Sequence, residues 1–302
     1  MKIGISSWAY PWAIGVPGYE LPAVPMDAFG LLERAATLGV EVLQIADNLP
    51  VDALPAPDID RLGTAAQRAG LALELGTRGV EPSHLARFLD LACCLKVRLV
   101  RTITYTDGHA LTLAQVEAWL REALPSYERA GVTLALENYE EHTSEELAGL
   151  VRRIGSPCLG ICLDTVNSLG ALETPAEVVH ILSPLTVNVH VKDFSIARIP
   201  SRMGYLVTGR PAGAGCIDIP WLIGQVRQCG REPNVIVEQW PPFSNTLSAT
   251  IALEAAWAEQ SVRYLQRCLC GVERITVHAL VITDWCAPAL TPGARRWANG
   301  FR

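Results

Sequence analysis

The chain has 302 residues, of which 50% are hydrophobic and 19% are charged, and its mean hydropathy is +0.22. This composition supplies enough apolar surface for a large core and excludes a disordered protein. No apolar run approaches the roughly 18 to 20 residues that span a bilayer, which excludes a membrane protein. The first residues, MKIGISSWAY, lack the apolar segment of a secretory signal, so we expect a cytoplasmic protein.

The charge balance argues against a nucleic-acid partner. The 25 basic residues are outnumbered by 31 acidic ones, which gives a net charge of -6 and would repel a phosphate backbone. Nine cysteines are present without a CxxC pair, so we expect free, buried or incidental thiols. Only Cys268 and Cys270 are spaced to share a soft metal, and no further ligand lies near them in the sequence.

Eight short segments rich in β-branched and apolar residues recur along the chain, separated by stretches with apolar residues at helical spacing. The eight segments are residues 2–7, 41–46, 71–75, 97–102, 132–137, 159–164, 186–191 and 234–238. Several of the intervening helices are predicted to end at a glycine just before the next strand, such as Gly39 and Gly131. This alternation predicts parallel strands joined by crossover helices.

The fold that we expect is α/β: a (β/α)8 TIM barrel, formed as a single domain by residues 1–270. An open doubly wound sheet is the competing arrangement, but its GxGxxG fingerprint is missing after the first strand. A helix predicted over residues 249–269 would close the barrel. Residues 271–302 contain one strand-like piece and no consistent period, so we expect them to form a C-terminal extension of unknown role.

Ligand-type residues follow one another at the ends of the last four predicted strands, where a barrel of this kind forms its active site. They are Glu137, Asp164, His190 and Glu238. A single carboxylate at such a position is commonly an ion-pair partner or a helix cap. Three that face one another would repel, however, and a divalent cation would remove the repulsion. Three carboxylates and an imidazole suit Mn²⁺, the ion that we expect, or Mg²⁺ or Co²⁺, better than a structural zinc.

Five motifs around these residues resemble the xylose isomerase-like barrels, a superfamily of sugar isomerases and epimerases, myo-inosose dehydratase and endonuclease IV. The motifs are ALEN at 135–138, LDT at 163–165, HVKD at 190–193, GAGCIDIPWL at 213–222 and VEQW at 237–240. The resemblance covers roughly residues 1–268 and is specific for the superfamily, not for one substrate. It implies that the four residues named above are the metal ligands, and that Glu137 and Glu238 are also the catalytic acid and base.

The same motifs suggest further contacts. Lys192 is a candidate catalytic residue that would neutralise a developing oxyanion, or else it forms an ion pair with a neighbouring acid such as Asp193. Asn138 and Asn167 are candidate substrate contacts. Where the epimerases have a histidine and a glutamate, this chain has Asn167 and Thr143, so its substrate contacts must differ from theirs.

The remaining candidates follow other strands. Trp8 could pack on the C–H face of a sugar or fill a hydrophobic plug, and Asp47 could bind hydroxyls or cap a turn. Arg101 ends the fourth strand. A long loop after the seventh strand carries three more arginines: Arg198, Arg202 and Arg210. Arginine forks bind carboxylates bidentately, so an acidic sugar is one alternative and plain surface charge is the other.

We therefore expect an enzyme with a small-molecule sugar or sugar-acid substrate, and the sequence leaves room for a homo-oligomer. The first hypothesis is a metal-dependent isomerase or epimerase of a keto sugar or sugar acid that acts through an enediolate. The alternative is a lyase, either a decarboxylase or a dehydratase, that acts on an oxo sugar acid. An endonuclease is disfavoured because its additional histidines are missing, and a non-catalytic sugar-binding barrel is disfavoured because all four ligands are present.

Overall fold

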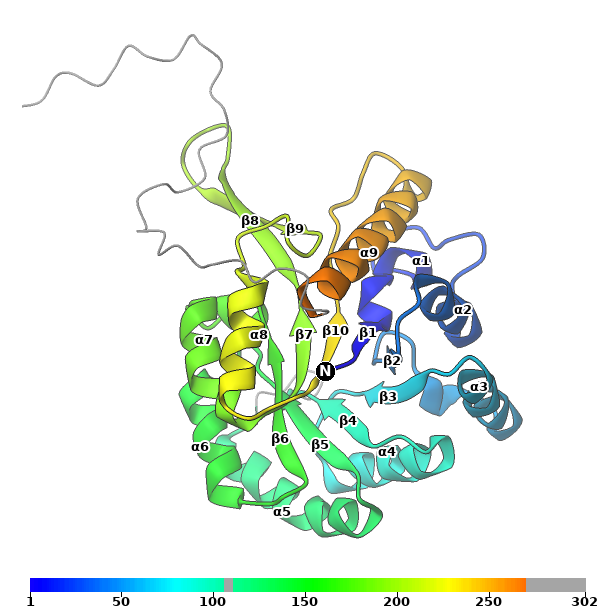
Figure 1. The fold of residues 1–302 in the computed structure, drawn as a ribbon, viewed down its shortest axis with the longest axis vertical. Coiled ribbons are helices and arrows are strands. Elements are labelled where there is room, and N and C mark those ends of the chain that lie inside the picture. Colours follow the sequence, from blue (N-terminus) through cyan, green and yellow to red (C-terminus); the bar gives the residue numbers. More distant parts are fainter. Residues whose placement is uncertain (106–110, 270–302) are drawn as a thin grey trace, which may run out of the picture.

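Eight parallel strands close into a barrel in the computed structural model, which describes residues 1–105 and 111–269 (Figure 1). Their order around the barrel is β1-β10-β7-β6-β5-β4-β3-β2. The strands are β1 (Ile3–Ser6), β2 (Val42–Ile45), β3 (Ala72–Gly76), β4 (Leu99–Thr102), β5 (Thr133–Glu137), β6 (Leu159–Asp164), β7 (Thr186–Val191) and β10 (Asn234–Val237). The predicted TIM barrel is confirmed, and each predicted strand agrees with the observed one to within two residues at either end.

Helices surround the barrel (Figure 1). Those described are α1 (Pro11–Ile14), α2 (Ala28–Leu38), α3 (Ala56–Arg68), α4 (Pro82–Leu95), α5 (Leu113–Ala130), α6 (Ser144–Ile154), α7 (Pro175–Leu182), α8 (Ile219–Gln228) and α9 (Leu247–Leu269). Three of them, α5, α6 and α7, begin with capping boxes built on threonine, which satisfy backbone donors of the first turn. The predicted stops at Gly39 and Gly131 are left-handed, with φ of 66° and 63°.

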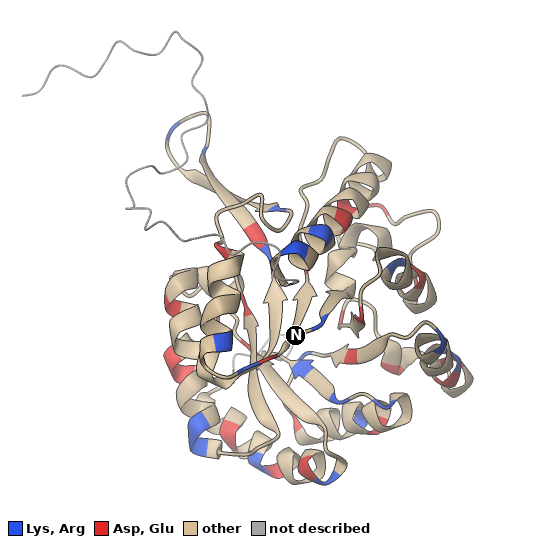
Figure 2. Cartoon of the chain, viewed as in Figure 1, with Lys and Arg blue, Asp and Glu red and all other residues tan. Residues whose placement is uncertain are grey.

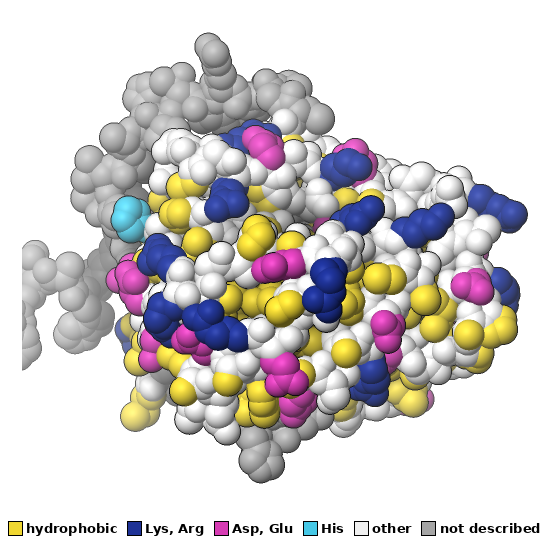
Figure 3. Space-filling view, turned by 90° about the horizontal axis from the view of Figure 1, so that it is seen from below, with side chains coloured by type: hydrophobic (Ala, Val, Ile, Leu, Met, Phe, Trp, Pro, Cys, Tyr) yellow, Lys and Arg dark blue, Asp and Glu magenta, His cyan; other side chains and the backbone are white. Residues whose placement is uncertain are grey.

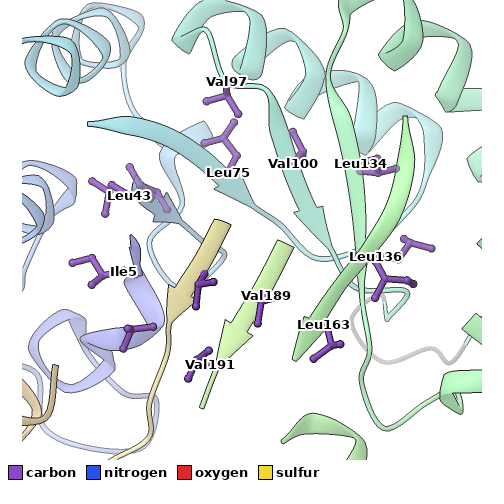
Figure 4. Packing of buried hydrophobic residues seen from close by; sticks show 14 of the residues in the cluster. Ile5, Leu43, Leu75, Val97, Val100, Leu134, Leu136, Leu163, Val189 and Val191 are labelled. Atoms are coloured by element: carbon purple, nitrogen blue, oxygen red, sulfur yellow. The ribbon is translucent and has the colours of Figure 1, made fainter. Parts of the chain in front are cut away.

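The alternation of side chains along each strand separates two environments. On β5, Leu134 and Leu136 pack in the large apolar cluster that includes the helices, whereas Ala135 packs with residues of the barrel interior. Figure 4 shows residues of the large cluster on strands around the barrel, Val189 and Val191 among them. Burying each such side chain contributes about 1.5 to 3 kcal/mol. The apolar layer thus fixes the strand faces and directs the alternate residues inward.

A β-hairpin stands where the sequence predicted a long loop. Its strands, β8 (Asp193–Arg198) and β9 (Tyr205–Arg210), pair antiparallel and extend away from the barrel (Figure 1). The loop prediction is wrong because both segments, FSIAR and YLVTGR, contain β-branched or aromatic residues on either side of a turn-rich PSRMG sequence. The hairpin inserts between β7 and α8 without interrupting the barrel.

The chain returns from the hairpin through a segment held by Asp193. The carboxylate of Asp193 accepts hydrogen bonds from the backbone N–H groups of Gly213, Gly215 and Ile217 at 2.9 to 3.1 Å. A Cβ atom on Gly215 would lie 2.1 Å from Asp193 Oδ1, so only glycine fits there. The HVKD and GAGCIDIPWL motifs therefore meet in space, and their contact is structural.

Some of the predictions concern residues outside the described part of the chain. The C-terminal extension predicted for 271–302, together with Cys270 and Cys286, lies outside the described residues, and the domain boundary stays a prediction. Of the described cysteines, only Cys162 is buried. In the described part of the chain, no helix is long and apolar enough to cross a membrane.

Most of the charged residues lie on the outer helices and loops in the view of Figure 2. On the face seen in Figure 3, lysines and arginines are interspersed with aspartates and glutamates. That face therefore carries no continuous basic surface of the kind that binds a phosphate backbone.

Candidate active site

Four ligand-type side chains meet at the carboxyl ends of neighbouring strands. Glu137 ends β5, Asp164 ends β6, His190 is next to last in β7, and Glu238 directly follows β10. The parallel register explains the meeting, because Asp164 and Ile236 are the partners of His190 in the two adjacent ladders. One ligand atom of each of the four residues lies within 4.8 Å of those of the other three. The structure thus brings together the four residues that the sequence singled out.

This cluster is deeply buried and incompletely paired. None of the four residues is more than 3% exposed. His190 Nδ1 lies 3.4 Å from Glu137 Oε1 and 3.3 Å from Glu238 Oε1. Neither His190 Nδ1 nor Glu238 Oε1 has a hydrogen-bond partner among the described residues. Leaving such an atom unsatisfied costs about 1 to 3 kcal/mol. Three carboxylates and one imidazole nitrogen converging in this way form a donor set for a divalent cation, so the residues fit the predicted metal site.

Neighbouring charges determine the ionisation of the cluster. Burial alone would raise the pKa of Glu137, but the positive charges of Arg101 and His190 outweigh it and lower the pKa below its usual range. The pKa of Glu238 is also lowered, because His190 and Lys192 outweigh the effect of burial. The pKa of Asp164 is raised, since burial and the two glutamates outweigh Lys192. Glu137 and Glu238 are therefore ionised.

Two cations neutralise part of this negative charge. Lys192 Nζ lies 2.9 Å from Asp164 Oδ2 and 3.1 Å from Glu238 Oε2. Arg101 Nε lies 2.8 Å from Glu137 Oε2. Burial by itself would lower the pKa of Lys192 and of Arg101, but the surrounding carboxylates raise both pKa values well above the usual range. Lys192 thus lies where the sequence predicted a catalytic cation.

The second ring nitrogen of His190 is held by Gln44 of β2. His190 Nε2 lies 2.8 Å from Gln44 Oε1, and Gln44 Nε2 donates to Glu74 and Asn188. Because the Gln44 amide group is used for donation elsewhere, its oxygen must accept the proton of His190 Nε2. The ring then presents Nδ1 to the carboxylates of Glu137 and Glu238. Gln44 is thus a buried partner that orients this histidine.

A cavity of about 120 Å³ adjoins the cluster. It is lined by Trp8, Asp47, Arg78, Arg101, Ile103, Glu137, Tyr139, Asn167, Lys192 and Glu238. Trp8, Asp47, Arg101 and Asn167 were predicted as substrate contacts, and all four line the cavity. Asn167 donates to Glu137 Oε1 at 2.7 Å and accepts from Lys192, so it links two candidate catalytic groups.

Two predicted substrate contacts have other roles. The side chain of Asn138 is fully buried, donates to the carbonyl oxygen of Asp164 and accepts from its N–H. Asn138 therefore orients the end of β6 instead of facing the cavity. Arg210 is exposed on β9, and its Nε donates to Ser195. Neither residue lines the cavity, and a substrate contact by either stays a prediction.

The other hairpin arginines are also away from the cavity. Arg198 lies over the ring of Tyr205, 4.4 Å from its centroid, and donates to the carbonyl oxygen of Arg202. Arg202 is exposed. The predicted arginine-rich loop over the site thus becomes a hairpin whose arginines interact with one another and with its own residues. Thr143, the second departure from the epimerase pattern, caps α6.

Three cavity residues were missed by the sequence analysis: Arg78, Ile103 and Tyr139. Each follows the end of a strand by one or two residues, β3, β4 and β5 respectively. The rule that located the metal ligands would therefore have found them if it had been extended past the last strand residue. Gln44 was also missed, because a single glutamine inside a strand carries no signal in the sequence.

A second and larger cavity, of about 670 Å³, lies at the opposite end of the barrel. Its lining includes Leu71, Leu99 and Asn234, which lie at or just before the amino ends of β3, β4 and β10. No metal-ligand cluster of the described residues lies there. The smaller cavity is therefore the candidate active site, at the end of the barrel where such enzymes carry out their chemistry.

Known proteins resemble the chain in sequence and in fold. It is 38% identical over 267 residues to 3-oxo-isoapionate decarboxylase from Pectobacterium atrosepticum, which covers 88% of this chain and 95% of the relative. A xylose isomerase-like TIM barrel protein from Mycobacterium smegmatis, solved in complex with magnesium, matches with a TM-score of 0.63 at 17% identity, covering 87% of this chain and 97% of that one.

A D-psicose 3-epimerase from Clostridium cellulolyticum H10, solved with D-tagatose, matches with a TM-score of 0.68 at 16% identity over 89% of this chain and 99% of that one. At these identities the two solved structures establish the fold alone. The profile of the xylose isomerase-like TIM barrel family matches residues 32–268. With the barrel and the site geometry in agreement, the chain belongs to the xylose isomerase-like TIM barrel family.

Proposed function

We propose that the protein is a divalent-metal-dependent lyase that decarboxylates a 3-oxo sugar acid. The observation that carries this proposal is the likeness to 3-oxo-isoapionate decarboxylase along nearly the whole of both chains. The buried cluster of three carboxylates and one histidine supports the metal dependence. The positive residues that line the cavity support an acidic substrate, since Arg78, Arg101 and Lys192 all face it.

The chemistry of a 3-oxo acid suits such a site. The bond between the carboxylate carbon and its neighbour breaks, CO₂ leaves, and the electron pair of that bond moves onto the ketone oxygen, forming an enolate. A divalent cation held by Glu137, Asp164, His190 and Glu238 would supply positive charge beside that oxygen. Lys192, whose Nζ lies among these carboxylates, adds a second positive charge. The enolate carbon then takes a proton, which the ammonium group of Lys192 can deliver.

The chemistry of the ligand atoms also indicates which metal ion the site favours. Hard oxygen donors with one imidazole favour Mn²⁺, with Mg²⁺ and Co²⁺ as alternatives. Asn167 and Arg101, which both contact Glu137, orient one carboxylate of the set. Gln44 orients the histidine ring.

A second candidate function is isomerisation or epimerisation of a keto sugar. It is favoured by one observation: Glu137 and Glu238 both line the cavity, where an ionised carboxylate can remove a carbon-bound proton. In this reaction a carbon-bound proton moves, no carbon is lost, and the enediolate replaces the enolate.

The two functions are separated by incubating the Mn²⁺-loaded protein in D₂O with 3-oxo-isoapionate and, in parallel, with the neutral ketoses D-fructose and D-allulose. Decarboxylation predicts CO₂ release and a product one carbon shorter that carries one deuterium at the carbon that lost CO₂. Deuterium uptake into a neutral ketose with no loss of mass from the oxo acid would overturn the lyase and favour the second candidate. The Glu238→Gln variant serves as the control for background loss of CO₂.

A further inference from the structure

We infer that Arg78 binds the carboxylate of the substrate, an inference that rests on the proposed function. Arg78 lies in the segment between β3 and α4 and lines the cavity with Trp8 and Asp47. The sequence suggested other arginines for this role, but those of the hairpin lie away from the cavity. Three cavity cations remain as candidates, and their contacts distinguish them.

Arg101 and Lys192 are already committed to the protein's own carboxylates. The Arg101 side chain is 4% exposed, contacts Glu137 and Asp47, and donates to the carbonyl oxygen of Thr77. Lys192 lies between Asp164 and Glu238 and donates to Asn167. Removing either cation from these partners would leave a buried carboxylate unpaired, which is strongly unfavourable. Neither is therefore free to hold a substrate carboxylate.

Arg78 differs from both. Its side chain is 34% exposed, and its Nε and Nη2 donate to the same oxygen, Asp47 Oδ2, at 3.2 and 3.0 Å. A guanidinium carries five N–H donors in a fixed fork, so three donors of Arg78 remain available. Among the described residues, those three have no hydrogen-bond partner in the structure. Arg78 can thus bind a substrate carboxylate while it keeps its hydrogen bonds to Asp47.

Asp47 holds this donor in place. It also accepts from Arg101 Nη1 at 3.2 Å and from Trp8 Nε1 at 3.3 Å. Burial would raise the pKa of Asp47, but Arg101 and Arg78 outweigh it and keep the carboxylate ionised. Trp8, Asp47 and Arg78 follow the neighbouring strands β1, β2 and β3, so one half of the barrel end forms a rigid binding surface. The metal-ligand residues occupy the other half.

Arg78 lines the same small cavity as Glu137 and Glu238 of the metal-ligand cluster. In a 3-oxo acid a single carbon separates the carboxylate from the oxo group, so the two binding groups must belong to one site. Asp47 connects the two sides of the cavity, because it contacts both Arg78 and Arg101, and Arg101 contacts Glu137. The cavity volume of about 120 Å³ favours a short sugar acid over a long one.

Binding of matched ligands tests the inference. Isothermal titration of the Mn²⁺-loaded protein compares D-erythronate with erythritol, which has a hydroxymethyl group in place of the carboxylate. Arg78→Met is expected to weaken D-erythronate binding by about 10- to 100-fold, the loss of a charge-assisted pair, and to change erythritol binding by less than 2-fold. Arg210→Met, the same substitution on the hairpin, is the matched control and is expected to change neither.

Arg78→Lys keeps the charge but not the fork, so an intermediate loss is expected, and it replaces the Met variant if thermal unfolding shows that the latter is not folded. Equal losses for both ligands, unchanged D-erythronate binding in the Arg78 variants, or no D-erythronate binding by the unmodified protein at 10 mM would each overturn the inference. Inorganic phosphate is titrated as well, and Arg78-dependent binding of phosphate in preference to D-erythronate would also overturn it. If Arg78 governs D-erythronate binding but no CO₂ is released from the oxo acid, the inference stands and decarboxylation falls.

Discussion

Two polar layers lie inside the barrel, and they differ in how their hydrogen bonds are satisfied. The upper layer is the metal-ligand cluster: Glu137, Asp164, His190 and Glu238. The lower layer consists of Gln44, Glu74, Asn188 and Asn234. In the lower layer, Glu74 accepts from all three amides at 2.7 to 3.1 Å, and no buried side-chain atom lacks a partner among the described residues. In the upper layer, His190 Nδ1 and Glu238 Oε1 have no hydrogen-bond partner among the described residues.

This difference in hydrogen bonding indicates that the lower layer has a structural role and the upper layer a functional one. Burial raises the pKa of Glu74, which accepts hydrogen bonds only from neutral amides. Glu137 is equally buried but has Arg101 beside it and stays charged. Proteins seldom leave buried polar atoms unsatisfied, so the upper layer is arranged for a partner that the chain does not itself provide. Gln44 joins the layers, since it contacts both His190 and Glu74.

The largest effect is expected from neutralising the upper layer. Glu137→Gln and Glu238→Gln are each expected to lower kcat by about 10³-fold or more, because each substitution removes a charged ligand of the metal that would stabilise the enolate. Steady-state kinetics with saturating Mn²⁺ measures the loss. Glu259→Gln, an exposed position on α9, is the control and should leave kcat unchanged. Near-normal turnover by either active-site variant would reject the assigned roles.

A smaller effect is expected from changing Gln44, the residue that contacts both layers. Gln44→Ala removes the acceptor that orients His190 and is expected to weaken Mn²⁺ binding by about 10- to 100-fold. Titration calorimetry with Mn²⁺ measures this directly, without recourse to activity. Gln67→Ala, on the exposed side of α3, is the matched control. Unchanged affinity in the Gln44 variant would mean that the barrel alone positions the histidine.

Glu254 is a buried carboxylate outside both layers, and its ionisation is expected to make stability depend on pH. Glu254 on α9 accepts from the backbone N–H groups of Trp12 and Ala13 at 2.7 and 3.0 Å, and burial raises its pKa to about 8. Between its ordinary value of 4.5 and about 8, the folded protein binds the proton more tightly than the unfolded chain does, so stability falls as pH rises through this range.

We expect this fall in the free energy of unfolding to amount to about 2 to 4 kcal/mol, and Glu254→Gln to abolish it. Urea denaturation at pH 5 and pH 8 measures the difference between the two proteins. The variant loses one acceptor and so is less stable at pH 5 by about 1 kcal/mol. Parallel pH profiles would show that Glu254 is ionised throughout.

Much of the fold and part of the site followed from local patterns. The strands were predictable because β-branched runs and helical periodicity are properties of neighbouring residues, and Glu137 and Asp164 were predictable because each ends such a run. The His190–Gln44 contact joins residues 146 positions apart, so no local pattern could reveal it. Arg210 shows the same limit, because the hairpin that carries it away from the cavity was not predicted from the sequence.

The smallest effect tests the lower layer. Glu74→Gln keeps a carbonyl oxygen that can accept from the neighbouring amides and is expected to cost about 1 kcal/mol. Glu74→Leu leaves the amides of Gln44, Asn188 and Asn234 facing an apolar group and is expected to cost about 1 to 3 kcal/mol for the first unsatisfied donor. Urea denaturation at pH 7 compares the two variants. If Glu74→Leu were as stable as Glu74→Gln, the amides would have found other partners. The amides of the lower layer could then change partners. Their satisfied hydrogen bonds would no longer distinguish the lower layer from the upper layer, where ligand atoms are unpaired.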